Sequence, residues 1–137
     1  MKKISFALAL ILVLATLLCG CDGFVRSYSA TMLVTSSIGD EGSMEFKTFN
    51  GTYSLSLRRD EDFPEHTIDC EASLTEGEMN VYIGVDGEKE LLFTIKGGER
   101  IDTTIPLEGK YDNEKKITII LESVGKCVGG DFEFEYN

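Results

Sequence analysis

Apolar and polar residues alternate through most of residues 26–137, with the two-residue period of strands that bury one face. No long segment shows the spacing of an amphipathic helix. Strands are expected at 26–34, 43–49, 52–59, 66–74, 78–85, 88–96, 99–107, 114–122 and 130–136. Eight or nine short strands with turns at this spacing are typical of antiparallel sandwiches and barrels. We therefore predict an all-β fold, an antiparallel two-sheet sandwich that is jelly-roll-like.

Two turns predict local strand pairing. Asn50-Gly51 is a strong two-residue hairpin signal, because both residues tolerate positive φ, and it would place Phe46 opposite Leu55. At Asp86-Gly87 a two-residue loop would put the apolar residues of the two strands on different faces. A three-residue loop with a bulge, which sets Val81 opposite Leu91, restores one apolar face.

The same alternation predicts which side chains point into the sandwich. The expected inward set is Phe46, Tyr53, Leu55, Ile68, Leu74, Val81, Ile83, Leu91, Phe93, Ile105, Ile117, Ile119, Leu121, Phe132 and Phe134.

The first 20 residues have the layout of a secretory signal peptide. Lys2 and Lys3 precede an uncharged apolar run over 4–18, which ends at small residues. An uncleaved membrane helix is the alternative, but a span needs about 20 apolar residues and this run is shorter. Ordinary secretion without a lipid is the other alternative.

The end of this leader, Leu18-Cys19-Gly20-Cys21, resembles the lipobox of bacterial lipoproteins. The resemblance implies cleavage before Cys21, a diacylglycerol and fatty acyl (palmitate-type) anchor on that residue, and a location on the outer face of the cytoplasmic membrane. The expected organisation is a signal peptide over 1–20, the lipidated Cys21 with a short tether over 21–25, and a β-sandwich domain over 26–137.

The length and charge of the mature chain limit the number of domains and the kinds of partner that it can have. Removal of the leader leaves 117 residues, enough for one domain. It also removes two lysines and no acidic residue, so the net charge falls from −11 to −13. A surface this acidic repels nucleic acid and anionic headgroups, and we expect no nucleic-acid partner.

Two cysteines, Cys70 and Cys127, remain in the mature domain beside the anchor. In an oxidising exterior a lone pair is more often bridged than free, so we predict a Cys70–Cys127 disulfide, with two buried thiols as the alternative. Together with a single histidine they are too few for a zinc site.

The sequence gives no catalytic set. His66 is the sole histidine, and neither a Gly-x-Ser-x-Gly nor a phosphate-binding pattern is present, so we expect a protein that is not an enzyme. No cofactor is expected except possible Ca²⁺. Calcium needs six or more oxygens, and the loop with Asp60 and Asp62 is the best place for them. Ordinary solvated turns are the alternative.

Exposed aromatic side chains are the candidate ligand-binding residues, because sugar-binding surfaces use aromatic platforms. The candidates are Tyr28, Tyr82, Tyr111 and Phe63. The segments Glu76–Ile83, Lys116–Ile119 and Gly129–Phe134 resemble, in order and rhythm, small β-sandwich lipoproteins of Gram-positive gut bacteria, which resemble carbohydrate-binding sandwiches in outline. We predict a membrane-anchored, non-catalytic binding module for an envelope protein partner. Alternatives are a glycan-binding module and a calcium-dependent or structural envelope protein.

Overall fold

The computed structural model describes residues 26–59, 66–108 and 114–137. These ranges hold nine β-strands and no helix, and therefore no helix that could cross a membrane. The strands are β1 (Ser27–Thr31), β2 (Val34–Ile38), β3 (Glu41–Arg58), β4 (Thr67–Glu76), β5 (Glu78–Val85), β6 (Glu88–Lys96), β7 (Arg100–Pro106), β8 (Lys116–Ser123) and β9 (Cys127–Tyr136). The predicted all-β fold is confirmed.

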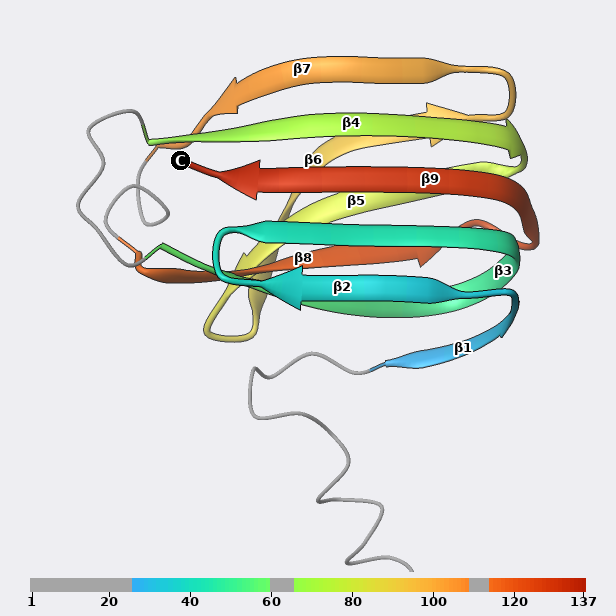
Figure 1. Cartoon of the computed structure of the whole chain (residues 1–137), viewed down its shortest axis with the longest axis horizontal. Coiled ribbons are helices and arrows are strands. Elements are labelled where there is room, and N and C mark those ends of the chain that lie inside the picture. Colours follow the sequence, from blue (N-terminus) through green and yellow to red (C-terminus); the bar gives the residue numbers. More distant parts are fainter. Residues whose placement is uncertain (1–25, 60–65, 109–113) are drawn as a thin grey trace, which may run out of the picture.

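All pairings are antiparallel, and they build two layers that share β3 (Figure 1). The first half of β3 pairs with β2 and β9, and β9 continues through β4 to β7. The second half of β3 pairs with β8, which continues through β5 to β6, while β1 pairs across the middle of β3. We call these the front layer and the rear layer. Their order, β3-β9-β4-β7 over β3-β8-β5-β6, is that of the jelly roll we predicted.

The predicted hairpin at Asn50-Gly51 is wrong. The chain does turn back there, but β3 continues through the turn and passes from one layer to the other (Figure 1). Leu55 therefore pairs with Ile119 of β8, and Phe46 pairs with Gly130 of β9. The two halves face each other across the core, because a Cβ added at Gly42 would lie 2.7 Å from Leu57 Cδ2.

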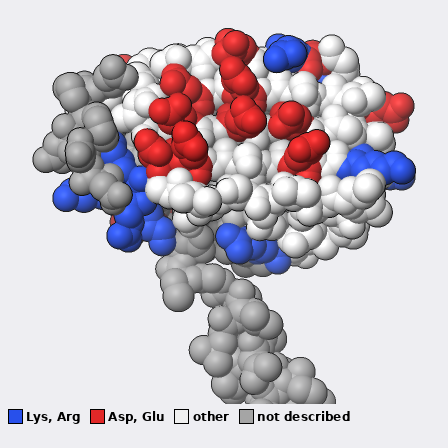
Figure 2. All heavy atoms as spheres, in the orientation of Figure 1, with Lys and Arg blue, Asp and Glu red and all other residues white. Residues whose placement is uncertain are grey.

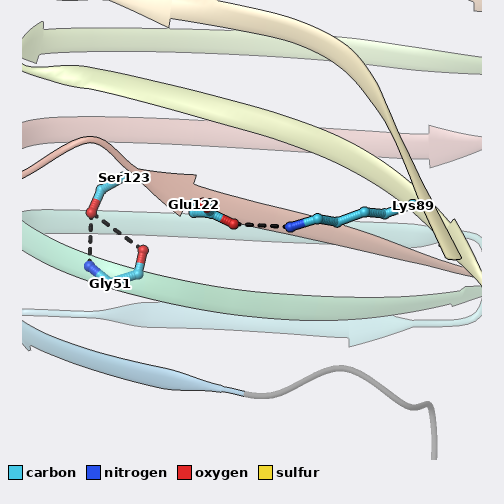
Figure 3. Close-up of polar contacts among 4 residues, drawn as sticks. All are labelled: Gly51, Lys89, Glu122 and Ser123. Atoms are coloured by element: carbon cyan, nitrogen blue, oxygen red, sulfur yellow. Dashed lines mark hydrogen bonds and ion pairs between the residues drawn. The ribbon is translucent and has the colours of Figure 1, made fainter. Parts of the chain in front are cut away.

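A glycine is required at position 51 for two reasons. Its φ is +133°, and a Cβ there would collide with the backbone of Ser27 and Tyr28 in β1. The Ser123 hydroxyl, at the end of β8, accepts from Gly51 N–H at 2.7 Å and donates to its carbonyl at 3.2 Å (Figure 3). These contacts hold the crossing point against both neighbouring strands.

The predicted three-residue loop between β5 and β6 is also wrong. Val85 pairs with Glu88, so the loop is the two-residue Asp86-Gly87, with both residues at positive φ. The conflict between faces is resolved deeper in the hairpin, by a bulge that sets Val81 opposite Phe93 and Tyr82 opposite Leu91. Because of this bulge Leu91 lies on the outer face and is 55% exposed, contrary to our expectation.

The core lies between the layers and contains most of the predicted inward set. Of the fifteen residues expected there, Leu91 is exposed, whereas Tyr53, Phe93 and Ile105 are half-buried against the core. The largest buried side chains outside these fifteen residues are Met44, Phe49, Leu57, Met79, Ile95 and Tyr136. The predicted hairpin register placed Phe49 on the face opposite to Phe46 and Leu55, yet Phe49 is fully buried.

The predicted disulfide is not formed. Cys70 and Cys127 are both buried free thiols. Cys70 lies opposite Phe134, seven residues along β9 from Cys127, a separation of roughly 24 Å at strand spacing. A disulfide requires Cα atoms within about 7 Å. Burial, with Asp69 nearby, raises the pKa of Cys70 to about 12, so this thiol stays protonated.

Candidate functional site

Carboxylates line up across the outer face of the front layer. In one row the register places Asp102, Glu71 and Glu133 side by side, continued by Ser43 and Ser36. These positions belong to β7, β4, β9, β3 and β2 in that order.

The two neighbouring rows have the same character. The next row runs Thr104, Asp69, Glu135, Glu41 and Ile38, and the third runs Arg100, Ser73, Asp131, Glu45 and Val34. Arg100 is the one cation in the three rows. We call these rows the acidic face, and Figure 2 shows acidic side chains gathered over this part of the molecule.

The acidic face is hollowed over its first two rows. The hollow has a volume of about 640 Å³ and takes its lining from five strands, from β2 at one side to β7 at the other. The short side chains of Ser36 and Ser43 leave space beside the longer carboxylates of Glu41, Glu133 and Glu135. A polar concavity on a rigid sheet is suited to bind a ligand rather than to pack against the rest of the chain.

Most of these carboxylates face like charges across the strands. Glu71 lies opposite Glu133, and Glu135 lies between Asp69 and Glu41. Asp69 accepts hydrogen bonds from Thr104 Oγ1 at 2.5 Å and from Asn137 Nδ2 at 3.1 Å, which fix its carboxylate. The limited desolvation of this exposed carboxyl, followed by the charges of Asp40, Asp69 and Glu41, raises the pKa of Glu135 above its ordinary value. Directly opposed like charges destabilise a sheet, so this arrangement costs folding free energy.

Removing one of these charges is therefore expected to stabilise the domain. At neutral pH, Glu135→Gln should raise the free energy of unfolding, by less than about 1 kcal/mol because the group is exposed. As pH falls through the raised pKa of Glu135, the folded state binds its proton before the unfolded state does. The wild type thus gains stability and the advantage of Glu135→Gln disappears.

Urea unfolding of both proteins at a series of pH values measures this difference. Glu90→Gln, on β6 of the rear layer, is the matched control and should change stability little. An advantage of Glu135→Gln that persists at pH values below the ordinary carboxyl pKa would contradict the assigned repulsion.

Two of the predicted aromatic binding residues, Tyr28 and Tyr82, lie within the described residues, and they are far apart. Tyr28 on β1 is 46% exposed, with its ring stacked 5.7 Å from that of Phe49. Tyr82 lies on the outer face of the rear layer as expected, half-buried, with Lys89 Nζ 4.3 Å from its ring centroid. Lys89 is held there by an ion pair to Glu122 at 3.0 Å (Figure 3). Three strand steps, roughly 14 Å, separate β1 from β5, and neither tyrosine lines the hollow.

The other predicted site residues lie outside the described residues. These are Tyr111, Phe63, Asp60, Asp62 and Cys21. Within the described ranges, no group of three or more His, Cys, Asp or Glu side chains is arranged to hold a metal ion. His66 begins the turn into β4, and its carbonyl accepts a hydrogen bond from Leu107 N–H at 2.8 Å.

Sequence reasoning missed the acidic face. Its signal was present, because Glu133 and Glu135 alternate with Phe132 and Phe134, and Asp69 and Glu71 alternate with Ile68 and Cys70. Alternation shows that each pair points outward. The pairing of β9 with both β3 and β4, which brings the rows together, follows from the crossing of β3 between layers, and no local pattern reveals it.

Comparison with known proteins gives a distant likeness. No protein-family model and no curated protein matches the chain. Variants of a family 29 carbohydrate-binding module, in complex with mannohexaose and with cellulohexaose, are 16% identical and overlap with TM-scores of 0.43 and 0.44. The overlaps cover 84% of this chain and 79% and 78% of those modules. The EutQ protein of Clostridium difficile is 21% identical, with a TM-score of 0.33 over 70% of this chain and 54% of that one. At such values, what these proteins bind does not indicate the ligand of this chain.

Proposed function

We propose that this chain is a lipoprotein of the outer face of the cytoplasmic membrane, anchored through Cys21, whose β-sandwich is a non-catalytic binding module. Its binding surface is the acidic face, and its ligand is a cationic segment of a protein partner in the cell envelope. The observation that carries the proposal is the alignment, in three adjoining rows, of eight carboxylates, six of which line the hollow. Repulsion among them destabilises the free domain, and a bound cation would relieve it.

A neutral glycan is the second candidate ligand. The hollow is lined by both carboxylates and the hydroxyls of Ser36, Ser43, Thr103 and Thr104, which can accept and donate hydrogen bonds to sugar hydroxyls. The two candidates differ in their response to salt. Attraction between charges is screened as ionic strength rises, whereas hydrogen bonding to an uncharged sugar is affected little.

Calorimetric titration separates the candidates, with a short oligolysine peptide as the cationic probe and mannohexaose as the neutral one. We expect oligolysine to bind the full-length protein in neutral detergent and to lose its affinity at high salt. Glu71→Lys with Glu133→Lys should weaken binding by at least about tenfold, because several exposed ion pairs of 0.2–1 kcal/mol are lost or reversed.

The matched control is Glu88→Lys with Glu90→Lys, which changes the net charge equally on β6, the edge strand of the rear layer. If this control weakens oligolysine binding as much as the test variant does, the attraction is one of net charge and the assigned surface is wrong. Mannohexaose binding that persists in high salt and is lost in the test variant would favour the glycan.

A further inference from the structure

The segment that forms β1 and β2 is an unguarded sheet edge. Residues 27–38 contain no charged residue and no proline. Among the described strands, β1 and β2 each pair with β3 alone, so their other edge offers unpaired backbone N–H and C=O groups. The remaining edge strands carry the usual protection against pairing: β6 has Glu88, Lys89, Glu90 and Lys96, and β7 has Arg100, Asp102 and Pro106.

Apolar side chains stand in solvent along this edge. Met32 is 76% exposed at the bend between β1 and β2, Val34 is 65% exposed and Ile38 is 76% exposed. They make up half of the large hydrophobic side chains exposed in the described part of the chain. Val34 and Ile38 point to the same side as the acidic face, as their register with Glu45 and Glu41 requires.

The inward side chains of β2 fix it in place. Thr35 Oγ1 lies 3.0 Å from the Tyr53 hydroxyl, and Ser37 donates a hydrogen bond to the carbonyl of Ser56. Both partners lie in the second half of β3, so β2 bridges the two layers. A strand that binds there would meet an edge that is already ordered. The protein would therefore lose little conformational entropy on binding.

The carboxylates of the acidic face lie beside this edge and would favour a binding segment that carries positive charge. A strand added to β2 would lie about 4.8 Å beyond it, with alternate side chains beside Val34 and Ile38. The next side chains along those rows are Glu45 and Glu41, followed by Asp131 and Glu135. Lysine or arginine at alternate positions of the added strand could lay its apolar stem on Val34 or Ile38 and bring its charge to these carboxylates.

We propose that β2 binds an extended segment of a protein partner, added as an antiparallel or parallel strand, with basic residues at alternate positions facing the acidic face. This inference rests on the proposed function and specifies how its cationic partner is held. A bilayer is a poorer occupant, because hydrocarbon would leave the strand edge unpaired. A second copy of the chain is also poorer, since it would bring two acidic faces together.

Hydrogen exchange and calorimetry on the full-length protein in neutral detergent test the proposal with two synthetic peptides. The first alternates lysine and valine. The second has the same sequence and charge but is N-methylated at every residue, so that neither of its edges can donate hydrogen bonds to a neighbouring strand. We expect the first peptide to bind and to protect the amides of 34–38, and the second to bind at least about tenfold more weakly.

Val34→Lys should weaken binding of the unmethylated peptide by at least about tenfold, because it places a guarding charge on the edge. Val124→Lys is the matched control, since Val124 is an exposed valine in the turn between β8 and β9, and it should retain the affinity. Strand addition is supported if N-methylation weakens peptide binding, if the peptide protects the amides of 34–38, and if Val34→Lys loses affinity whereas Val124→Lys retains it.

Other outcomes overturn it and point elsewhere. Equal binding of the two peptides would mean that charge alone attracts them, which ends the strand proposal and leaves the proposed function standing. Binding of neither peptide would end both. Protection of 34–38 without peptide that grows with protein concentration would assign the edge to a second copy. Protection that appears on transfer to anionic phospholipid vesicles would assign it to the bilayer.

Discussion

Gly130→Ala is expected to lower the free energy of unfolding by about 2–3 kcal/mol, the upper part of the range for an overpacked core. Gly130 lies in β9 opposite Phe46, and a Cβ there would overlap the Phe46 ring. That ring cannot withdraw, because it is 3% exposed and packs against Phe49 at 5.3 Å and Phe132 at 6.2 Å between centroids. Urea unfolding of the full-length protein measures the loss.

Phe46→Leu supplies the control for this prediction. The smaller side chain should itself destabilise the core, yet Gly130→Ala should cost much less in its presence, giving a favourable coupling energy in the double-mutant cycle. Additive effects of the two substitutions would show that the ring is not the obstacle. If Gly130→Ala alone does not fold, recovery of folding in the double variant provides the same test.

Cys21→Ala should abolish fatty-acid labelling and leave the precursor uncleaved, because the lipobox interpretation gives that sulfur the anchor and its peptide bond the cleavage site. The loss of labelling should be complete, because alanine has no sulfur that could be acylated. The protein should also lose its stable membrane anchor, which depends on the buried acyl chains. Metabolic labelling with a fatty acid, together with intact mass measurement, detects both changes.

Cys19→Ala is the matched control, a cysteine two positions earlier that should be labelled and processed as in the wild type. Labelling that survives Cys21→Ala would contradict the assigned anchor. Loss of labelling in Cys19→Ala, with Cys21 intact, would move the anchor to the earlier cysteine.

The fold could be predicted from the sequence because alternation is a local signal. Buried positions in β8 and β9, such as Ile117, Ile119 and Phe132, follow from it directly. Where the predictions failed, a longer-range constraint decided. Asn50-Gly51 has the residues of a hairpin turn. However, β1, β8 and β9 pair with different stretches of β3, and these pairings place its two halves in different layers.

The cysteine prediction failed for a related reason. The expected extracytoplasmic location favoured a bridge, but the register places Cys70 and Cys127 near opposite ends of neighbouring strands. The acidic face could not be predicted from the sequence for the same reason. The outward acidic residues can be identified in each strand, but their assembly into rows depends on the strand order. The sequence analysis chose exposed aromatic residues as the binding candidates instead. One of them, Tyr82, lies beneath the side chain of Lys89.

Backbone amide NMR of the full-length protein in neutral detergent, titrated with oligolysine, tests most directly whether the acidic face is the binding surface. We predict shift changes concentrated at outer-face positions of β4, β9 and the first half of β3, including Asp69, Glu71, Glu133 and Glu135, with β5 and β6 unaffected. Shift changes centred instead on the rear layer around Tyr82, or spread evenly over both layers, would contradict the proposed function.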